Sequence, residues 1–378
     1  TLSLHDALPI FVCLMKFKLQ IICYYAMRRI VYIGFSLLIL LSSCRSSDSF
    51  FDMFPVTLKL TPQSVTMETD SISKPIMMEY SKGKLYFCNI FTSPLIDVFD
   101  WETGHYMGSF GNRGVGADEF IGFDSMNRYS DNGLFLFDNN KKEGVVWCTD
   151  SLAGNNKRIT IENTENVFPF KVVGLDNDLF LSTGIVKGGR FALYNGTGNL
   201  VSVFGQYSYD EEHIYTDREV ECAFAYQSEM AYNKINKVLA VANRYGESIS
   251  FYNLGNLSDI QLMEEYLSSH PQYENASTEN SSSVVFERDN IEGFVDMAST
   301  SDYCIGLYLG ETRLRGGKWK GGNILLLFDW KGKPLCKIVM PRKYEMMTSS
   351  EDEIILFGTD NEKSEYVIDK INISDINY

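Results

Sequence analysis

The stretch KLYFCNIFTSPLIDVFDWETGHYMGSFG, residues 84–111, contains three apolar runs separated by short polar segments. The runs are rich in aromatic and β-branched side chains, and each closes on or beside Asn, Asp or Gly, residues that favour turns. Such runs are typical of short β-strands joined by tight connections. The stretch therefore predicts consecutive antiparallel strands of one sheet.

The same arrangement recurs along the chain. Runs comparable with 84–90 begin at residues 133, 178, 237, 303 and 353, and runs comparable with 94–100 begin at residues 144, 190, 248, 324 and 365. Four strands per unit, repeated six times, predict an all-β, six-bladed β-propeller of four-stranded antiparallel blades over residues 56–378, because radial repetition leaves few exposed strand edges. A β-sandwich or a pair of barrels is the alternative that the pattern leaves open.

Two segments lie outside the simple repeat. The last unit lacks a clear fourth strand after residue 371, and VTLKL at 56–60 is free at the other end of the chain. We expect VTLKL to pair as the outer strand of the last blade and to close the ring. We also expect residues 259–269 to form a short helix, followed by a polar excursion at 275–283.

Residues 27–43 have the pattern of a secretory signal peptide. Arg28 and Arg29 precede an apolar run from Ile30 to Leu41, which is too short to span a bilayer, and small residues then lead to Cys44. LSSC at the end of this pattern resembles a bacterial lipobox, so we expect Cys44 to carry the lipid.

The remaining residues before the propeller are assigned by position. Residues 44–55 are expected to form the lipidated tether, and residues 1–26 are expected to be non-native or to arise from upstream translation, so they are left out of the fold. A signal anchor extended upstream is the alternative, although Lys16 and Lys18 would interrupt its apolar run.

Composition limits the function. The chain has 378 residues, is 45% hydrophobic and carries a formal net charge of −15. This content of apolar residues supports a large core, and the acidic balance argues against nucleic acid as a partner. Dinucleotide, Walker, zincin and nucleophile-elbow motifs are absent from the sequence. We expect no cofactor and no metal centre, and we expect the cysteines after Cys44 to be buried thiols.

The lipobox, the six degenerate units and the run SFGNRGVGADEF at 109–120 together resemble the TolB-like six-bladed propeller lipoproteins of Bacteroidota, and this run is also similar to NHL-type repeats. The resemblance implies a lipid-anchored protein of the cell envelope, at the outer membrane, on its periplasmic or its surface side. It supplies no catalytic motif.

Loop lengths indicate where function resides. In an up-and-down blade, the connections from second to third strand and from blade to blade lie at one end. These connections contain the long segments 111–120, 205–222, 267–291 and 311–322. Function on a rigid scaffold usually resides in such loops.

The candidate binding residues in these loops combine aromatic rings with charges of both signs. They are Arg113, Asp118, Glu119, Tyr207, Tyr209, Arg315, Lys318, Trp319 and Lys320. This chemistry suits a glycan, a peptide or an envelope protein as the partner, besides the membrane reached through the lipid. The alternatives are a solvated acidic loop for the tyrosine segment and a hairpin tip that balances neighbouring acids for the basic one.

We therefore expect a non-catalytic binding or scaffold module that acts through its long loops. The alternative is a hydrolase or lyase on a glycan or ester, with its site at the central funnel. Facing carboxylates, or a histidine and a carboxylate, with perturbed pKa values across the funnel would favour the enzyme. Aromatic residues at its mouth without such a pair would favour binding.

Overall fold

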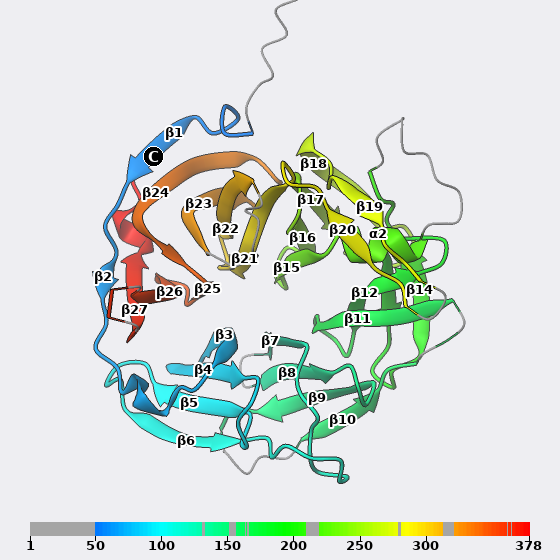
Figure 1. Cartoon of the computed structure of the whole chain (residues 1–378), viewed down its shortest axis with the longest axis horizontal. Coiled ribbons are helices and arrows are strands. Elements are labelled where there is room, and N and C mark those ends of the chain that lie inside the picture. Colours follow the sequence, from blue (N-terminus) through cyan, green and yellow to red (C-terminus); the bar gives the residue numbers. More distant parts are fainter. Residues whose placement is uncertain are drawn as a thin grey trace, which may run out of the picture. The chain divides into compact units, whose positions relative to one another are not determined.

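The computed structural model describes residues 50–378 except 131–132, 151–155, 163, 165, 209–218, 279–280, 313–320, 361 and 364. Residues 50–378 form one compact unit. Within it, six antiparallel sheets surround a central channel, and the first strand of each sheet lies innermost (Figure 1). The predicted six-bladed propeller is thereby confirmed.

Each blade contains four antiparallel strands in sequential order, except that the last takes its outer strand from the beginning of the unit. Blade one comprises β3 (Pro75–Ser81), β4 (Lys84–Asn89), β5 (Ile96–Asp100) and β6 (Tyr106–Phe110). Blade two comprises β7 (Ser125–Ser130), β8 (Gly133–Asp138), β9 (Glu143–Cys148) and β10 (Lys157–Thr160). Blade three comprises β11 (Val167–Gly174), β12 (Phe180–Val186), β13 (Phe191–Tyr194) and β14 (Leu200–Phe204). Blade four comprises β15 (Ser228–Asn233), β16 (Val238–Asn243), β17 (Glu247–Asn253) and β18 (Gln261–Ser269). Blade five comprises β21 (Ile291–Ser299), β22 (Tyr303–Thr312), β23 (Gly322–Asp329) and β24 (Pro334–Tyr344). Blade six comprises β25 (Met346–Ser349), β26 (Glu353–Asp360), β27 (Glu365–Asn372) and β2 (Gln63–Ser64).

The second strands explain the strongest signal in the sequence. Neighbouring blades cover both faces of these strands, so their side chains avoid water on either side. GLFLFD of β8 and VLAVAN of β16 are buried at every position. Outer strands face solvent on one side, and YMGSF of β6 accordingly begins with exposed residues. Continuous apolar runs therefore mark the second strands, and mixed runs mark the outer ones.

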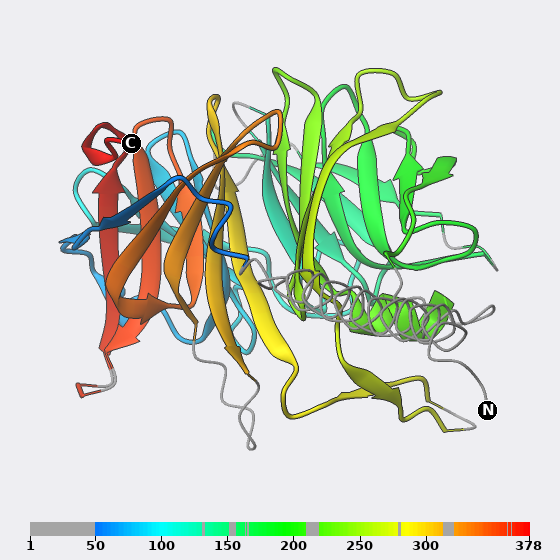
Figure 2. The same ribbon diagram turned by 90° about the horizontal axis from the view of Figure 1, so that it is seen from above.

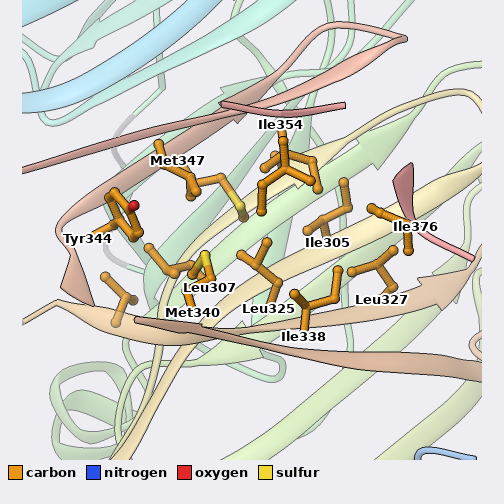
Figure 3. Close-up of a cluster of buried hydrophobic side chains, with 14 of the residues drawn as sticks. Ile305, Leu307, Leu325, Leu327, Ile338, Met340, Tyr344, Met347, Ile354 and Ile376 are labelled. Carbon is orange, nitrogen blue, oxygen red and sulfur yellow. The ribbon is translucent and has the colours of Figure 1, made fainter. Parts of the chain in front are cut away.

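The hydrophobic core is divided into clusters at the junctions between neighbouring blades. Figure 3 shows the cluster between blades five and six, in which Leu307, Leu325 and Ile338 of blade five meet Met347 and Ile354 of blade six. Comparable clusters lie at the other junctions. Each blade is thus held by apolar burial on both of its faces.

Closure of the ring differs from the expectation for VTLKL. β1 (Val56–Lys59) pairs in parallel with β24 and adds a fifth strand to blade five. The last blade instead receives β2, whose Gln63 and Ser64 pair antiparallel with Lys370 and Asp369 of β27. The prediction that the N-terminal end closes the last blade is correct, but the assignment of VTLKL to that blade is wrong. Parallel pairing of β1 carries the chain across the outside of blade five before β2 reaches blade six (Figure 1).

The residues before β1 are also part of the core. The solvent exposure of Phe50 is 2% and that of Phe54 is 6%. The Phe50 ring stacks on Tyr308, with ring centroids 5.6 Å apart, and Phe54 meets the edge of Phe328 at 5.2 Å. The segment from Phe50 to Ser64 therefore both packs against blade five and pairs with blade six.

The predicted helix at 259–269 is wrong. Gln261–Ser269 forms β18, the outer strand of blade four, because its backbone pairs along the length of β17. The polar stretch that follows belongs to a hairpin of β19 (Tyr273–Asn275) and β20 (Val284–Phe286). Regular helix appears in the 205–222 segment instead, where α2 (Glu219–Ala225) begins. Short 3₁₀ turns at Thr69–Ser71 and Ile373–Asp375 complete the described elements.

The cysteines after Cys44 are free thiols, as predicted. Cys88, Cys222, Cys304 and Cys336 are buried, and Cys148 is partly buried. Burial raises the pKa of the Cys88 and Cys336 thiols to about 12. Helices within the described ranges are all too short, or too polar, to cross a bilayer.

Candidate functional site

Connections from second to third strand and from blade to blade share one end of the propeller, which we call the long-loop face. The Arg113 guanidinium, in the crossing from blade one to blade two, donates to the Ile90 carbonyl of the β4–β5 connection at 2.9 Å. The Gly188 N–H of the β12–β13 connection donates to the Glu219 carboxylate of α2 at 3.1 Å. Helix α2 and the β19–β20 hairpin lie on the same side of the blades (Figure 2).

The β22–β23 connection starts from the same face. Thr312, the last residue of β22, pairs with Ile291, the first residue of β21, which follows the blade-to-blade crossing. The predicted gathering of the long segments 111–120, 205–222 and 311–322 on one face is therefore confirmed for their described residues.

The candidate binding residues divide into two groups. Arg113, Asp118, Glu119 and Tyr207 are described, and all four lie on the long-loop face. The other candidates lie outside the described residues, as does Cys44: they are Tyr209, Arg315, Lys318, Trp319 and Lys320. A binding role for any of these residues stays a prediction.

The 111–120 segment uses its charged residues to hold its own shape. The Glu119 carboxylate accepts the Gly116 N–H at 2.8 Å, and the Lys141 ammonium donates to the carbonyls of Gly116 and Glu119 at 2.6 and 2.5 Å. A Cβ at Gly114 would lie 2.0 Å from the Glu119 Oε2, so a larger residue there would have to displace this carboxylate. Glu119 is thus engaged within the loop, and Asp118 remains exposed to solvent.

Tyr207 lines a pocket of about 380 Å³ on the long-loop face, which we call the α2 pocket. The pocket lies between blades two and three and the helix. Its walls are formed by Asp124, Asn139, Phe168, Phe170, Lys171, Thr183, Gly184, Arg190, Tyr207, Ala223, Phe224, Tyr226, Gln227 and Ser228. A predicted site residue and a cavity of ligand size therefore coincide here.

Helix α2 forms one wall of this pocket because its two faces have different partners. Glu219 and Glu221 in its first turn favour the helix start through the helix dipole. Cys222 and Ala225 are buried in a cluster with the β19–β20 hairpin. Phe224 instead faces the Phe170 ring of β11, with centroids 5.0 Å apart. The hairpin thus supports the helix from behind while Phe224 faces the pocket.

Aromatic rings make up much of the pocket wall. The rings of Tyr207 and Tyr226 pack against each other with centroids 5.2 Å apart, and each residue is only 7% exposed to solvent. Phe168 is 40% exposed, and the Lys142 ammonium lies 3.7 Å from its ring centroid. These rings offer flat faces for a ligand at fixed positions.

Arg190 is the most buried charged group of the wall, at 3% exposure. Its Nη2 donates to the Ser228 Oγ at 2.7 Å and to the Asn243 Oδ1 at 2.6 Å. Its guanidinium carbon lies 5.2 Å from the Phe191 ring centroid and 5.5 Å from that of Tyr207. Among the residues that the structure describes, neutral oxygens and aromatic faces thus hold this cation in place.

Asp124 adds a carboxylate to the pocket wall. Although the residue is exposed overall, the protein atoms around its carboxyl raise its pKa, while a hydrogen bond from the Asn139 N–H at 2.9 Å acts in the opposite direction. Partial burial lowers the pKa of the nearby Lys142, and the Asp124 carboxylate counteracts that effect. The pocket therefore presents both signs of charge.

A second cavity, of about 190 Å³, occupies the short-loop end of the central channel. The Arg128 guanidinium of β7 crosses this channel and donates to the Ser299 carbonyl of β21 at 2.9 Å and to the Ser349 carbonyl of β25 at 3.3 Å. Its backbone N–H donates to the Glu79 carboxylate of β3 at 3.1 Å. Arg128 therefore ties together the inner strands of four blades.

Toward the long-loop end, the channel contains a group of charged side chains, which we call the channel cluster: Lys171, Glu229, Arg244 and Asp296. The Lys171 ammonium donates to both Glu229 carboxylate oxygens at 2.8 and 2.9 Å, and Arg244 lies 3.5 Å from the same carboxylate. The Asp296 carboxylate accepts the backbone N–H groups of Met297 and Met347 at 2.8 and 2.7 Å. Burial, and then the neighbouring Glu229 carboxylate, raise the pKa of Asp296 well above its usual range.

Several wall residues were not identified from the sequence. Arg190 stands in the short connection KGGR at 187–190, and the 205–222 segment stops just before Phe224 and Tyr226. A charged residue at the first position of the apolar run RFALYNG was the one signal that could have pointed to Arg190. Within the described ranges, His, Cys, Asp and Glu side chains nowhere gather in threes that could hold a metal ion.

A family model described as TolB-like 6-blade propeller-like matches residues 56–352. A member of the DUF4221 family from Bacteroides vulgatus is similar in structure, with a TM-score of 0.55 at 12% sequence identity over 82% of this chain and 95% of that protein. A candidate exported protein from Bacteroides fragilis has a TM-score of 0.52 at 10% identity over 84% of this chain and 98% of its own. Both likenesses concern the fold alone, and the curated proteins give no match.

Proposed function

This chain belongs to the TolB-like family of six-bladed propellers, and from that premise we propose that it is a non-catalytic binding module anchored in the cell envelope. Its site is the α2 pocket on the long-loop face. The partner is a small ligand, or a short segment of a glycan, peptide or envelope protein that fits into the pocket.

The observation that carries this proposal is the α2 pocket itself. Its volume of about 380 Å³ lies within the range of ligand sites, and it combines aromatic walls with a few polar groups. The walls come from strands of blade three and from a helix that a hairpin supports, so they are held in place before a ligand arrives. A preformed pocket of this kind supports binding more directly than long loops alone.

The channel cluster is the arrangement nearest to a catalytic pair, since Glu229 and Asp296 are close carboxylates and Asp296 has a raised pKa. Both carboxylates are engaged, however: Glu229 by Lys171 and Arg244, and Asp296 by two backbone N–H groups. The walls of the α2 pocket and of the short-loop cavity consist of other residues, apart from Lys171 in the former. We therefore favour a structural role for the pair and a binding role for the protein.

Export to the envelope is supported by the signal pattern at 27–43, by the lipobox before Cys44 and by the candidate exported protein that shares the fold. The outer membrane is the proposed location, with the lipid on Cys44 as the anchor. An acidic chain with a net charge of −15 would be repelled by anionic headgroups, so the lipid rather than the protein surface would hold it there.

Replacing Phe168 with alanine should weaken binding at the α2 pocket about tenfold, or by about 1.4 kcal/mol, because the ligand loses one aromatic face. The side chain is 40% exposed, so the thermal stability of the protein should change little. The measurement is a thermal-shift screen of glycans and peptidoglycan fragments, followed by titration calorimetry of the best binder with both proteins.

Phe91→Ala is the matched control. Phe91 is also an exposed phenylalanine on the long-loop face with a lysine over its ring, since Lys74 lies 5.0 Å from its centroid, but it belongs to blade one. It should leave the affinity unchanged. Equal loss of affinity in the two variants, or no loss in either, would place the site elsewhere on the molecule.

Lipid attachment has its own test. Cells that express the full chain should incorporate labelled palmitate into the protein, and Cys44→Ala should remove the label while leaving the fold intact, because Cys44 precedes the compact unit. The label is detected after immunoprecipitation and electrophoresis. Labelling of both proteins to the same extent would exclude Cys44 as the attachment site.

A further inference from the structure

Arg190 is a buried cation, and no carboxylate among the described residues neutralises its charge. Its side chain makes two hydrogen bonds, both through Nη2, to the neutral Ser228 and Asn243 side chains. Within the described residues, no carboxylate lies at ion-pair distance from the Arg190 guanidinium, and the further side chain within its hydrogen-bonding reach is the Tyr252 hydroxyl. A guanidinium has five donors, so part of its edge is left for another group.

Two other arginines of the chain, Arg158 and Arg342, face carboxylates, whereas Arg113 and Arg128 donate to backbone carbonyls. Arg158 lies 2.6 Å from the Glu143 carboxylate, and Arg342 lies 3.8 Å from the Asp369 carboxylate, although both are far more exposed than Arg190. Burial of a charge without a counter-ion is unfavourable, because the low-dielectric surroundings replace water poorly. An anionic ligand in the α2 pocket would supply the missing counter-ion.

The other charges at the pocket fit this assignment. Lys171 is neutralised by Glu229, to which it is bound through both oxygens. Asp124 is exposed, and Lys142 is near enough to influence its carboxyl. Arg190, at 3% exposure, is therefore the buried site at which a ligand charge would count most, and it favours a negative one.

The groups around Arg190 indicate the rest of the ligand. Phe170, Phe224 and Tyr207 offer ring faces, while Thr183 and Gln227 offer polar contacts. A guanidinium binds a carboxylate through two parallel hydrogen bonds, and flat aromatic faces pack against rings. On the basis of the binding function proposed above, we propose that the α2 pocket takes a ring-bearing organic carboxylate, with the carboxylate on Arg190 and the ring against the aromatic wall.

The experiment compares acids with their neutral counterparts on the purified protein. Titration calorimetry would use glucuronate against glucose, and phenylacetate against phenylacetamide. At least one acid should bind about 30-fold or more tightly than its neutral partner, because a buried charge-assisted pair is lost with the carboxylate. The pair that shows the preference distinguishes an acidic sugar from an aromatic acid.

Variants test the residue. Arg190→Gln should abolish the preference for the acid, whereas Arg158→Gln, which removes a paired arginine outside the pocket, should preserve it. Arg190→Lys keeps the charge and should retain part of the preference if Arg190→Gln does not fold. Added salt should weaken binding of the acid to the wild type but not that of its neutral partner.

The outcomes separate this inference from the proposed function. Equal affinity for acid and neutral partner, or a preference that persists in Arg190→Gln, would overturn the carboxylate assignment and leave the α2 pocket as a binding site for neutral ligands. Failure of all four probes to bind would also overturn it. The proposed function fails separately, if Phe168→Ala does not affect binding of the ligand found by screening.

Discussion

Replacing both Phe50 and Phe54 with alanine should lower the free energy of unfolding by about 6 kcal/mol, since each phenylalanine-to-alanine change in a core costs about 3 kcal/mol or more. The two side chains are almost fully buried, and they pack on Tyr308 and Phe328 of blade five. At roughly 2 °C or more per kcal/mol for a domain of this size, the melting temperature should fall by more than about 10 °C. Circular dichroism during heating measures the change.

Loss of these rings would also weaken the strands that follow them. Among the described strands, β1 pairs with β24 alone, and β2 contributes two residues to the edge of β27. Lys59→Ala serves as the control, because Lys59 is an exposed residue of β1 whose backbone pairing would remain. A loss of about 1 kcal/mol corresponds to about 2 °C in melting temperature. If the double variant melts within this interval of the wild type, residues 50–64 do not secure the ring.

The sequence predicted the blades well because the physics behind them is local. A second strand covered on both faces is mostly apolar, and the runs at 84–90 and 133–139 show this directly, with the polar Asn89 and Asp138 buried and hydrogen-bonded at their ends. The residues that close the ring could not be assigned in this way. β2 is two residues long, and both of its residues are exposed, so nothing in its own composition marks it as a strand. Its pairing depends on where the rest of the unit places β27.

The failure at 261–269 has a related cause. QLMEEYLSS contains residues with good helix propensity, and Leu262, Met263 and Leu267 remain partly exposed in the structure. Pairing with β17 nevertheless determines its conformation, which is an override of local preference by a neighbouring strand. The missed helix α2 is similar, since its buried face is created by a hairpin that begins almost fifty residues later.

The face that carries the α2 pocket could be predicted from the sequence, but most residues of the pocket wall could not. Blade parity alone places the long connections together, and Tyr207 was chosen for its chemistry within one of them. The α2 pocket, however, combines Asp124, Phe170, Arg190 and Phe224 from four separate parts of the chain. No local sequence pattern links these positions. The charge of Arg190 indicates a ligand site only because its hydrogen-bond partners in the folded chain are neutral.

The channel cluster leads to a pH-dependent stability that Asp296→Asn should remove. Burial and the Glu229 carboxylate raise the pKa of Asp296 in the folded chain, so the folded state holds this proton more tightly than the unfolded state. Its contribution to stability is therefore largest below the ordinary carboxyl pKa of about 4 and decreases as the pH rises through the raised value. The slope reaches up to about 1.4 kcal/mol per pH unit within that window.

Compared with the wild type, Asp296→Asn should be less stable at low pH and more stable at high pH. Asparagine has one amide oxygen, so it can accept only one of the two N–H groups that Asp296 now accepts, from Met297 and Met347. An unsatisfied buried donor costs about 1–3 kcal/mol of stability. Asp296→Asn should therefore be less stable than the wild type near pH 4.5, close to the lower end of the pH range over which Asp296 loses its proton. As the pH rises, the wild type loses the contribution of its proton and the variant does not, so the two stability curves should converge and then cross.

Urea unfolding at a series of pH values measures both curves, and their difference removes the titration of the many surface carboxylates that the two proteins share. Lys171 and Arg244 also face the cluster, and both are present in the two proteins compared. Parallel curves would mean that Asp296 is ionised throughout, and that Lys171 and Arg244 compensate both carboxylates. Convergence would instead establish that Asp296 carries a proton in the folded chain at low pH and loses it as the pH rises through its raised pKa.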